Sequence, residues 1–243
     1  MEKSDYAAAM RRDTTRFLTA VTGDLGLTVP SCPGWRGADL LWHVGEVYRF
    51  WTRVAEGEIT DPHTQYTEPE RPADDALPGW FAEGAEQCAA VLERLDPAEP
   101  RWSWSTQANA GFIQRRMAQE IAVHCWDAVN AVGRDEPVER TLALDGIDEL
   151  LTLFLPRAAP DGLPEAGLHL HATDAEGGAG EWTLRAVGGS WQLGREHGKA
   201  AAAVRGTASD LLLMLWGRRD ADRLEVFGDP EVIKAYRAAF ELD

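Results

Sequence analysis

The chain has 243 residues, of which 40 are acidic and 24 basic, giving a formal net charge of −16 at pH 7. This balance disfavours nucleic-acid and anionic-membrane partners, whose phosphates would repel the protein. Hydrophobic residues make up 44%, enough for one large core or two smaller ones. No apolar run resembles an export signal or approaches the roughly 20 residues of a membrane span, so we expect a cytoplasmic protein. Three cysteines without zinc-finger spacing argue against a disulfide framework.

The first 135 or so residues have the apolar spacing of helices. In the second of these, Leu40, Val44, Val47 and Trp51 recur at intervals of four, three and four residues. We predict helices over residues 5–22, 38–55, 76–95 and 112–132. The proline-rich stretch 60–73 and the stretch 100–110 are predicted loops. Four helices with connections of this length indicate a bundle.

The pattern changes after residue 133. One more helix is predicted at 144–156, followed by short alternating segments separated by glycine clusters. Strands are predicted at 168–172, 182–186, 190–193, 201–205 and 224–227, and further helices at 207–216 and 229–240. The sequence therefore predicts an α+β protein, with a helical domain at 1–138 and a small α+β domain at 139–243 whose helices lie on one face of its sheet.

Three side chains of the helical half stand out as metal ligands. His43 falls within the apolar stripe of its helix, and Glu120 and His124 lie four residues apart on one helical face. Two imidazoles and a carboxylate with an open position form a known catalytic zinc arrangement, and similar sites hold other divalent metals. Each histidine could instead be a hydrogen-bonded core residue, and Glu120 could pair with Arg116 on an exposed face.

Longer motifs surround these residues. The stretch Val29-Pro-Ser-Cys-Pro-Gly-Trp35, followed by Asp39-Leu-Leu-Trp-His43, resembles the entry to the second helix of mycothiol-dependent maleylpyruvate isomerase-like proteins. These are metal-binding members of the DinB-like four-helix superfamily. Glu120-Ile-Ala-Val-His124-Cys-Trp-Asp127 resembles their second signature. The stretch from Val204 through Leu-Trp-Gly-Arg218 is similar to the attached C-terminal domain, which has a sterol-carrier-like fold.

The resemblance implies roles for individual residues. His43, Glu120 and His124 match the metal ligands of the family, with Zn²⁺ the usual occupant. Arg218 matches an arginine that reaches the active site from the C-terminal domain, where it would hold a carboxylate of substrate or of mycothiol. An interdomain salt bridge is the alternative for Arg218. Asp127 could support His124, although a charge on the helix surface is slightly favoured.

The implied function is a Zn²⁺- and mycothiol-dependent enzyme in which a metal-activated thiolate attacks a small electrophile. Isomerases and thiol S-transferases share the same ligands, so both remain open, as do a non-catalytic binding or regulatory protein and a metal hydrolase that uses bound water. Substrate contacts are expected in the loops between 60 and 110. The working pocket is expected to be locally cationic, and the chain a monomer or homodimer.

The remaining histidines and cysteines give weaker indications of function. His169 and His171, two apart on a strand, could bind a metal, but an exposed pair is favoured. His63 and His197 lie in polar loops without further signal. Cys125 is expected to pack away from the metal. Cys32 has no evident basic partner, so a structural loop role is favoured.

Overall fold

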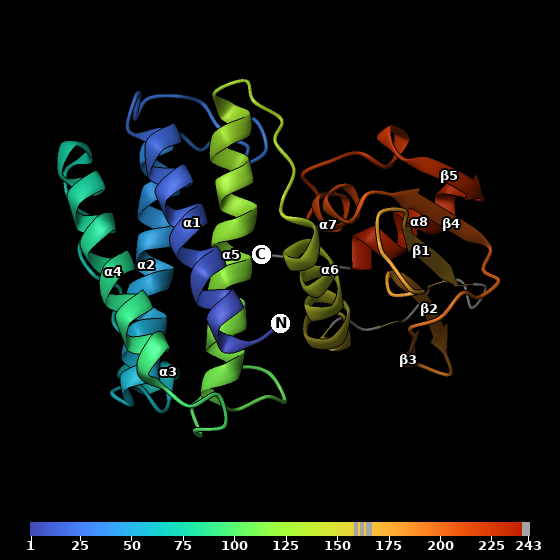
Figure 1. The fold of residues 1–243 in the computed structure, drawn as a ribbon, viewed down its shortest axis with the longest axis horizontal. Coiled ribbons are helices and arrows are strands. Elements are labelled where there is room, and N and C mark those ends of the chain that lie inside the picture. Colours follow the sequence, from blue (N-terminus) through green and yellow to red (C-terminus); the bar gives the residue numbers. More distant parts are fainter. Residues whose placement is uncertain (158–159, 161–162, 164–166, 240–243) are drawn as a thin grey trace. The chain divides into compact units, whose positions relative to one another are not determined.

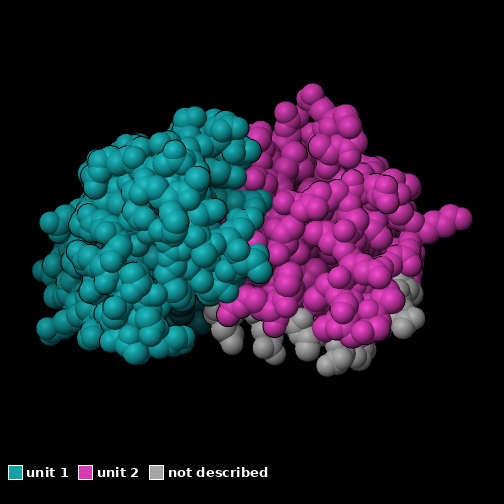
Figure 2. Space-filling model, turned by 90° about the horizontal axis from the view of Figure 1, so that it is seen from below, with its two compact units in different colours: residues 1–136 teal, residues 137–243 magenta. Residues whose placement is uncertain are grey.

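The computed structural model describes the whole chain except residues 158–159, 161–162, 164–166 and 240–243. Its contacts divide the chain into two compact units, residues 1–136 and residues 137–243, which are coloured separately in Figure 2. Among the described residues, no helix is both long and apolar enough to cross a membrane.

The first unit is built on four long helices (Figure 1). They are α1 (Lys3–Val21), α2 (Gly37–Glu56), α4 (Leu77–Arg94) and α5 (Ala110–Ala131). Helix α1 packs against α4 and α5, and α2 packs against the same two helices, so all four surround one core. The predicted helices and the bundle are therefore found.

One turn of helix, α3 (Pro62–Gln65), lies within the stretch predicted as a loop. The side chain of Asp61 accepts a hydrogen bond from the backbone N–H of His63 at 3.1 Å, and Pro62 occupies the first helical position, where it has no N–H to lose. A short 3₁₀ turn, Asp74–Ala76, then leads into α4. The proline-rich composition hid this capping signal.

The second unit begins with helix α6 (Arg140–Glu149), which continues as a π turn (Leu150–Phe154) and a 3₁₀ turn (Leu155–Arg157). A mixed five-stranded sheet follows, in the order β3-β2-β1-β4-β5, with β1 and β4 parallel and the other neighbours antiparallel. The strands are β1 (Leu168–Ala172), β2 (Glu181–Val187), β3 (Ser190–Gly194), β4 (Ala202–Gly206) and β5 (Glu225–Gly228). The remaining elements are α7 (Ala208–Leu215), a 3₁₀ turn at Ala221–Arg223, and α8 (Pro230–Ala239). The α+β class is confirmed, although position 240 of the last predicted helix lies outside the described residues.

The two faces of this sheet differ in chemistry. Leu168 and Leu170 of β1, like Trp182 and Leu184 of β2, are buried. Helices α7 and α8 contact β1 and β4. Because side chains alternate along a strand, the opposite face carries the polar residues of both strands, including two histidines and a glutamate.

Candidate metal centre

The two helices α2 and α5 bring His43, Glu120 and His124 together. The Nε2 atoms of His43 and His124 lie 3.2 Å and 3.3 Å from the same Glu120 Oε1. The imidazole rings meet edge to face, with centroids 5.0 Å apart. All three ligand atoms lie within 4.8 Å of one another, a spacing that one divalent ion could bridge.

Local structure explains this convergence. Glu120 and His124 are one turn apart on α5, so their side chains project from the same face. His43 lies in the second turn of α2, after a loop closed by hydrogen bonds between Val29 and Trp35 and between Trp35 and Cys32. The Trp35 ring consequently packs beside both imidazoles, with centroid distances of 5.0 Å to His43 and 6.4 Å to His124.

The Arg116 Nη2 atom lies 3.4 Å from the other oxygen of Glu120, Oε2. This is the pairing that the sequence offered as an alternative to metal binding. It occurs on an inward face, however, because the Arg116 side chain is only 5% exposed. The guanidinium and the two imidazoles therefore share the Glu120 carboxylate. The Arg116 ion pair coexists with the triad formed by His43, Glu120 and His124.

Asp127 is buried, which corrects the expectation of a charge on the helix surface. Its Oδ2 lies 2.9 Å from His124 Nδ1. An ionised carboxylate can only accept, so the proton is on Nδ1. In the neutral ring, this leaves the Nε2 lone pair directed toward Glu120. Such an arrangement fixes the orientation of a metal-binding histidine.

Cys32 also lies beside this histidine, although the sequence showed no basic partner for it. Its Sγ donates to Asp127 Oδ2 at 3.5 Å, and Cys32, His124 and Asp127 place their polar atoms within 4.8 Å of one another. The contact spans 95 residues. Only the fold could show it. Cys32 therefore helps to hold Asp127 against the imidazole.

The electrostatics of the triad favour an ion pair between His124 and Glu120. Burial by itself would lower the pKa of His124, but hydrogen bonds with Asp127, Cys32 and Glu120 outweigh it and hold the pKa well above its usual range. Burial would raise the pKa of Glu120, but hydrogen bonds from His124 and His43 hold it well below its usual range. Glu120 is thus ionised and available as a ligand at neutral pH.

A cavity of about 530 Å³ opens beside His43. Trp35 and Trp42 form apolar parts of its wall, and the loop before α4 contributes Glu68 and Arg71. The lining residues are Gly34, Trp35, Asp39, Trp42, His43, Glu46, Glu68 and Arg71. This loop belongs to the region where substrate contacts were expected, although no single residue of it was foreseen.

Most of the charged side chains that line this cavity are acidic. The expectation of a locally cationic pocket rested on bound Zn²⁺ and Arg218, and it stays a prediction. Asp39, Glu46 and Glu68 stand against one guanidinium, that of Arg71. The Arg71 Nη1 atom donates a hydrogen bond to Asp39 Oδ1 at 2.8 Å, which ties the loop before α4 to the start of α2. Burial and the nearby Glu68 raise the pKa of Glu46.

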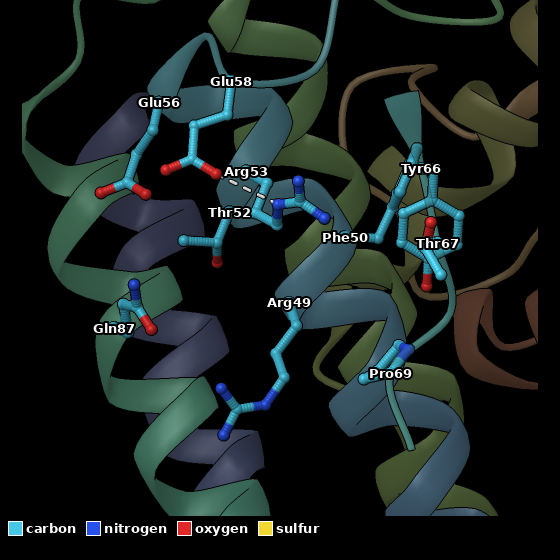
Figure 3. A pocket seen from close by; sticks show the side chains of 10 residues that line it. All are labelled: Arg49, Phe50, Thr52, Arg53, Glu56, Glu58, Tyr66, Thr67, Pro69 and Gln87. Atoms are coloured by element: carbon cyan, nitrogen blue, oxygen red, sulfur yellow. Dashed lines mark hydrogen bonds and ion pairs between the residues drawn. The ribbon is translucent and has the colours of Figure 1, made fainter. Parts of the chain in front are cut away.

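A second cavity of about 300 Å³ lies farther along α2, and Figure 3 shows its lining. Its cations come from Arg49 and Arg53, and Arg53 pairs with Glu58 at 3.1 Å. The guanidinium of Arg49 lies 4.5 Å from the Trp80 ring centroid. No histidine or cysteine is among the described residues that line this cavity, whereas His43 lines the first one.

The other two predicted positions have separate surroundings. Cys125 is buried, and burial raises the pKa of its thiol to about 12, in agreement with the expected packing role. Arg218 lies in the second unit, in the turn after α7, where its NH1 donates to the carbonyl of Trp216 at 2.9 Å. Its contact with the triad stays a prediction.

Comparison with known families matches both halves of the chain. The model described as "Mycothiol maleylpyruvate isomerase N-terminal domain" matches residues 7–129, and the "MDMPI C-terminal domain" model matches residues 141–235. The chain belongs to the mycothiol maleylpyruvate isomerase family. No sequence among the curated proteins matches it.

Solved structures of this family share the fold. The crystal structure of the mycothiol-dependent maleylpyruvate isomerase has a TM-score of 0.63 with this chain, and a variant with one histidine replaced by alanine has 0.65. Each is 13% identical in sequence, and each match covers 93% of both chains. At this identity the likeness extends to the architecture alone.

Proposed function

We propose that this member of the mycothiol maleylpyruvate isomerase family is a Zn²⁺- and mycothiol-dependent enzyme acting on a small electrophile that carries a carboxylate. The observation that carries the proposal is the convergence of His43, Glu120 and His124 at a cavity of about 530 Å³. Family membership supports mycothiol as the thiol and isomerisation as the reaction.

The donor set fits a divalent metal of the zinc class. Two imidazole nitrogens and a carboxylate oxygen are typical ligands of catalytic Zn²⁺ and leave a position for an exogenous ligand. Asp127 supplies the oriented hydrogen bond that such a histidine normally has. When bound, Zn²⁺ would lower the pKa of a coordinating thiol, making thiolate available at neutral pH.

The residues of the chain would do the remaining work. Glu120 stays ionised through its contacts with both histidines and Arg116, and Asp127 keeps the His124 ring in one tautomer. Trp35 packs beside both imidazoles and forms part of the cavity wall. In the cavity, Arg71 supplies the positive charge that would attract a substrate carboxylate, while its terminal nitrogens pair with Asp39 and Asp74.

In an isomerase, the thiolate would add to an activated double bond of the substrate, the resulting single bond would rotate, and the thiolate would be expelled. Thiol and substrate atoms are both conserved, and the geometry of the double bond changes. In an S-transferase, the thiol would remain attached to the product. The family match favours isomerisation over transfer.

The test is an assay of the purified full chain with mycothiol, Zn²⁺ and a panel of electrophiles that includes maleylpyruvate. Isomer and thiol conjugate are quantified separately. We expect isomer formation that requires both mycothiol and metal. Formation of a conjugate would identify a transferase, and formation of a hydrolysis product without thiol would identify a hydrolase. A chain that binds no divalent metal would contradict the proposal.

A further inference from the structure

The second unit contains another group of metal-ligating side chains, on the polar face of its sheet. His169 and His171 lie two residues apart on β1, so they share this face. Glu181 of β2 pairs directly with His171 in the antiparallel register. A third imidazole, that of His197, comes from the segment between β3 and β4. Three imidazoles, two from β1 and one from the segment between β3 and β4, thus surround the carboxylate of β2.

The contacts converge on the two oxygens of Glu181. His169 Nε2 contacts Oε2, while His171 Nδ1 and His197 Nδ1 lie 3.2 Å and 3.6 Å from Oε1. The rings of His169 and His197 meet edge to face, with centroids 4.9 Å apart. The ligand atoms of His169, Glu181 and His197 all lie within 4.8 Å of one another.

Burial shows that this is not the exposed strand pair expected from the sequence. His169 is 5% exposed, and the side chain of Glu181 is 14% exposed. The side chain of His197 is 77% exposed, which leaves one approach to the cluster open to solvent. An inner histidine, a shielded carboxylate and an outer histidine therefore form a site with an entry path.

The segment that carries His197 is anchored on both sides. Thr183, paired with His169 in the sheet, donates its hydroxyl to the carbonyl of Glu196 at 3.1 Å. Arg195 pairs with Asp148 of α6 at 2.6 Å, and Arg185 of β2 donates to the carbonyl of Lys199 at 2.6 Å. These contacts fix the backbone on each side of His197.

Gly198 allows the close approach of this segment to β2. A Cβ atom at this position would lie 2.8 Å from the hydroxyl oxygen of Thr183, which is closer than such atoms come in proteins. A side chain directly after His197 would therefore displace the Thr183 hydroxyl, which bonds to the carbonyl of Glu196. The glycine at position 198 is therefore suited to the close packing that places His197.

Ion pairing alone does not account for three imidazoles on one carboxylate. A single carboxylate balances one imidazolium, and a pair that includes an exposed histidine contributes little to stability. Neutral imidazoles instead present nitrogen lone pairs, which together with a carboxylate form a ligand set suited to Zn²⁺ and related divalent ions.

We propose that His169, Glu181 and His197 form a second binding site for a divalent transition-metal ion of the zinc class, with His171 at its edge. The site takes its ligands from the second unit alone and does not depend on the proposed function of the triad. Three protein ligands leave at least one position for His171 or for water.

Zinc titration of the full chain tests this site. The background variant carries His43→Ala and Glu120→Gln, which removes two triad ligands and keeps the His124–Asp127 hydrogen bond. After equilibrium dialysis against Zn²⁺, we expect about one equivalent per chain in this variant. Adding His197→Ala or His169→Gln should remove that equivalent, whereas His63→Ala should retain it. His63 is the matched control because it is an exposed histidine outside both clusters.

Substitution with Co²⁺ supplies a second measurement. The background variant should acquire the visible absorption of a nitrogen-ligated ion, and adding His197→Ala should abolish it. His197 is exposed, so this change leaves the core intact and circular dichroism should be unaltered. The proposal is overturned if the background variant binds no Zn²⁺, or if its Zn²⁺ and Co²⁺ signals survive both substitutions.

Discussion

The two histidine clusters combine the same kinds of side chain, imidazoles and one carboxylate, on different backbones. In the helical unit, Glu120 and His124 meet because they are one turn apart, and only His43 comes from another element. In the sheet unit, His169, Glu181 and His197 come from a strand, its neighbour and a connecting segment. One turn of helix assembles two ligands locally, whereas a sheet must first pair its strands. The clusters also differ in what positions their histidines. The buried Asp127 orients His124, whereas a backbone contact of the preceding residue places His197.

The largest expected difference between the two clusters is in enzymatic turnover. His43→Ala is expected to lower mycothiol-dependent turnover by about 10²-fold or more, because a free thiol is only a few per cent ionised at neutral pH and is not positioned. His197→Ala should remove zinc from the sheet cluster while leaving turnover within about twofold. Steady-state rates and metal content of both variants check this, and equal loss of turnover in both would remove the distinction.

The orienting carboxylate belongs to the helical cluster. Asp127→Asn is expected to weaken Zn²⁺ binding at the triad by about 10- to 100-fold, the usual cost of losing such a partner. It also removes a hydrogen bond that raises the pKa of His124, so the pH profile of zinc binding should move toward lower pH. Competition with a chromophoric chelator across a pH series measures both effects. An altered affinity with an unmoved profile would argue for a purely structural role.

The pH dependence of the triad has a defined sign. The pKa of metal-free His124 is raised, so below that pKa the ring holds a proton that Zn²⁺ must displace. Glu120, with its lowered pKa, stays ionised and adds no second proton over this range. Triad affinity should therefore fall by about tenfold for each pH unit below the raised pKa of His124. Calorimetric titration of the His197→Ala variant isolates this dependence, and a flat profile would contradict it.

The two cavities of the helical unit are expected to differ in substrate binding. Arg71→Ala should raise KM for a carboxylate-bearing electrophile by about tenfold with a smaller change in kcat, since a charge-assisted hydrogen bond contributes about 1.5–3 kcal/mol. Arg53→Ala, in the cavity of Figure 3, is the matched control and should leave KM unchanged. If an uncharged electrophile shows the same increase, Arg71 acts on the loop and not on the carboxylate.

The sheet cluster can be weakened through its backbone. Gly198→Ala brings a Cβ against the Thr183 hydroxyl and should displace His197, with a several-fold loss of Zn²⁺ affinity in the variant that lacks the triad ligands. Gly194→Ala is the control, because its nearest neighbour would be at an ordinary 3.7 Å. Zinc titration of both variants provides the comparison. An equal effect from both would mean that the close approach at Gly198 is unimportant.

The sequence predicts the elements and the shared face of Glu120 and His124 well because both follow local periodicity. The i, i+4 spacing of Glu120 and His124 is sufficient to place them on one face, and alternation locates β1 at residues 168–172. Asp127 had the same kind of signal, since it lies three residues after His124. Its burial depends on the distant Cys32 loop, however, and a charge considered alone favours solvent.

The sheet cluster shows where local reasoning ends. His169 and His171 were visible as a same-face pair, but Glu181 joins them only through the register of two strands. His197 lies 28 residues after His169 and reaches it through the contact of Thr183 with Glu196. Arg71 is similar, because a proline-rich loop gives no indication of which side chain it turns toward a cavity. These placements follow from long-range packing, which periodicity does not encode.

The burial of all three cysteines has a consequence for an enzyme proposed to use a small thiol. Disulfide exchange requires an accessible thiolate, and burial raises the pKa of Cys88 and of Cys125 to about 12. When the cellular pool of such a thiol becomes oxidised, its disulfide would find no reactive sulfur at either position. A redox-active co-substrate would therefore not trap Cys88 or Cys125 as a mixed disulfide.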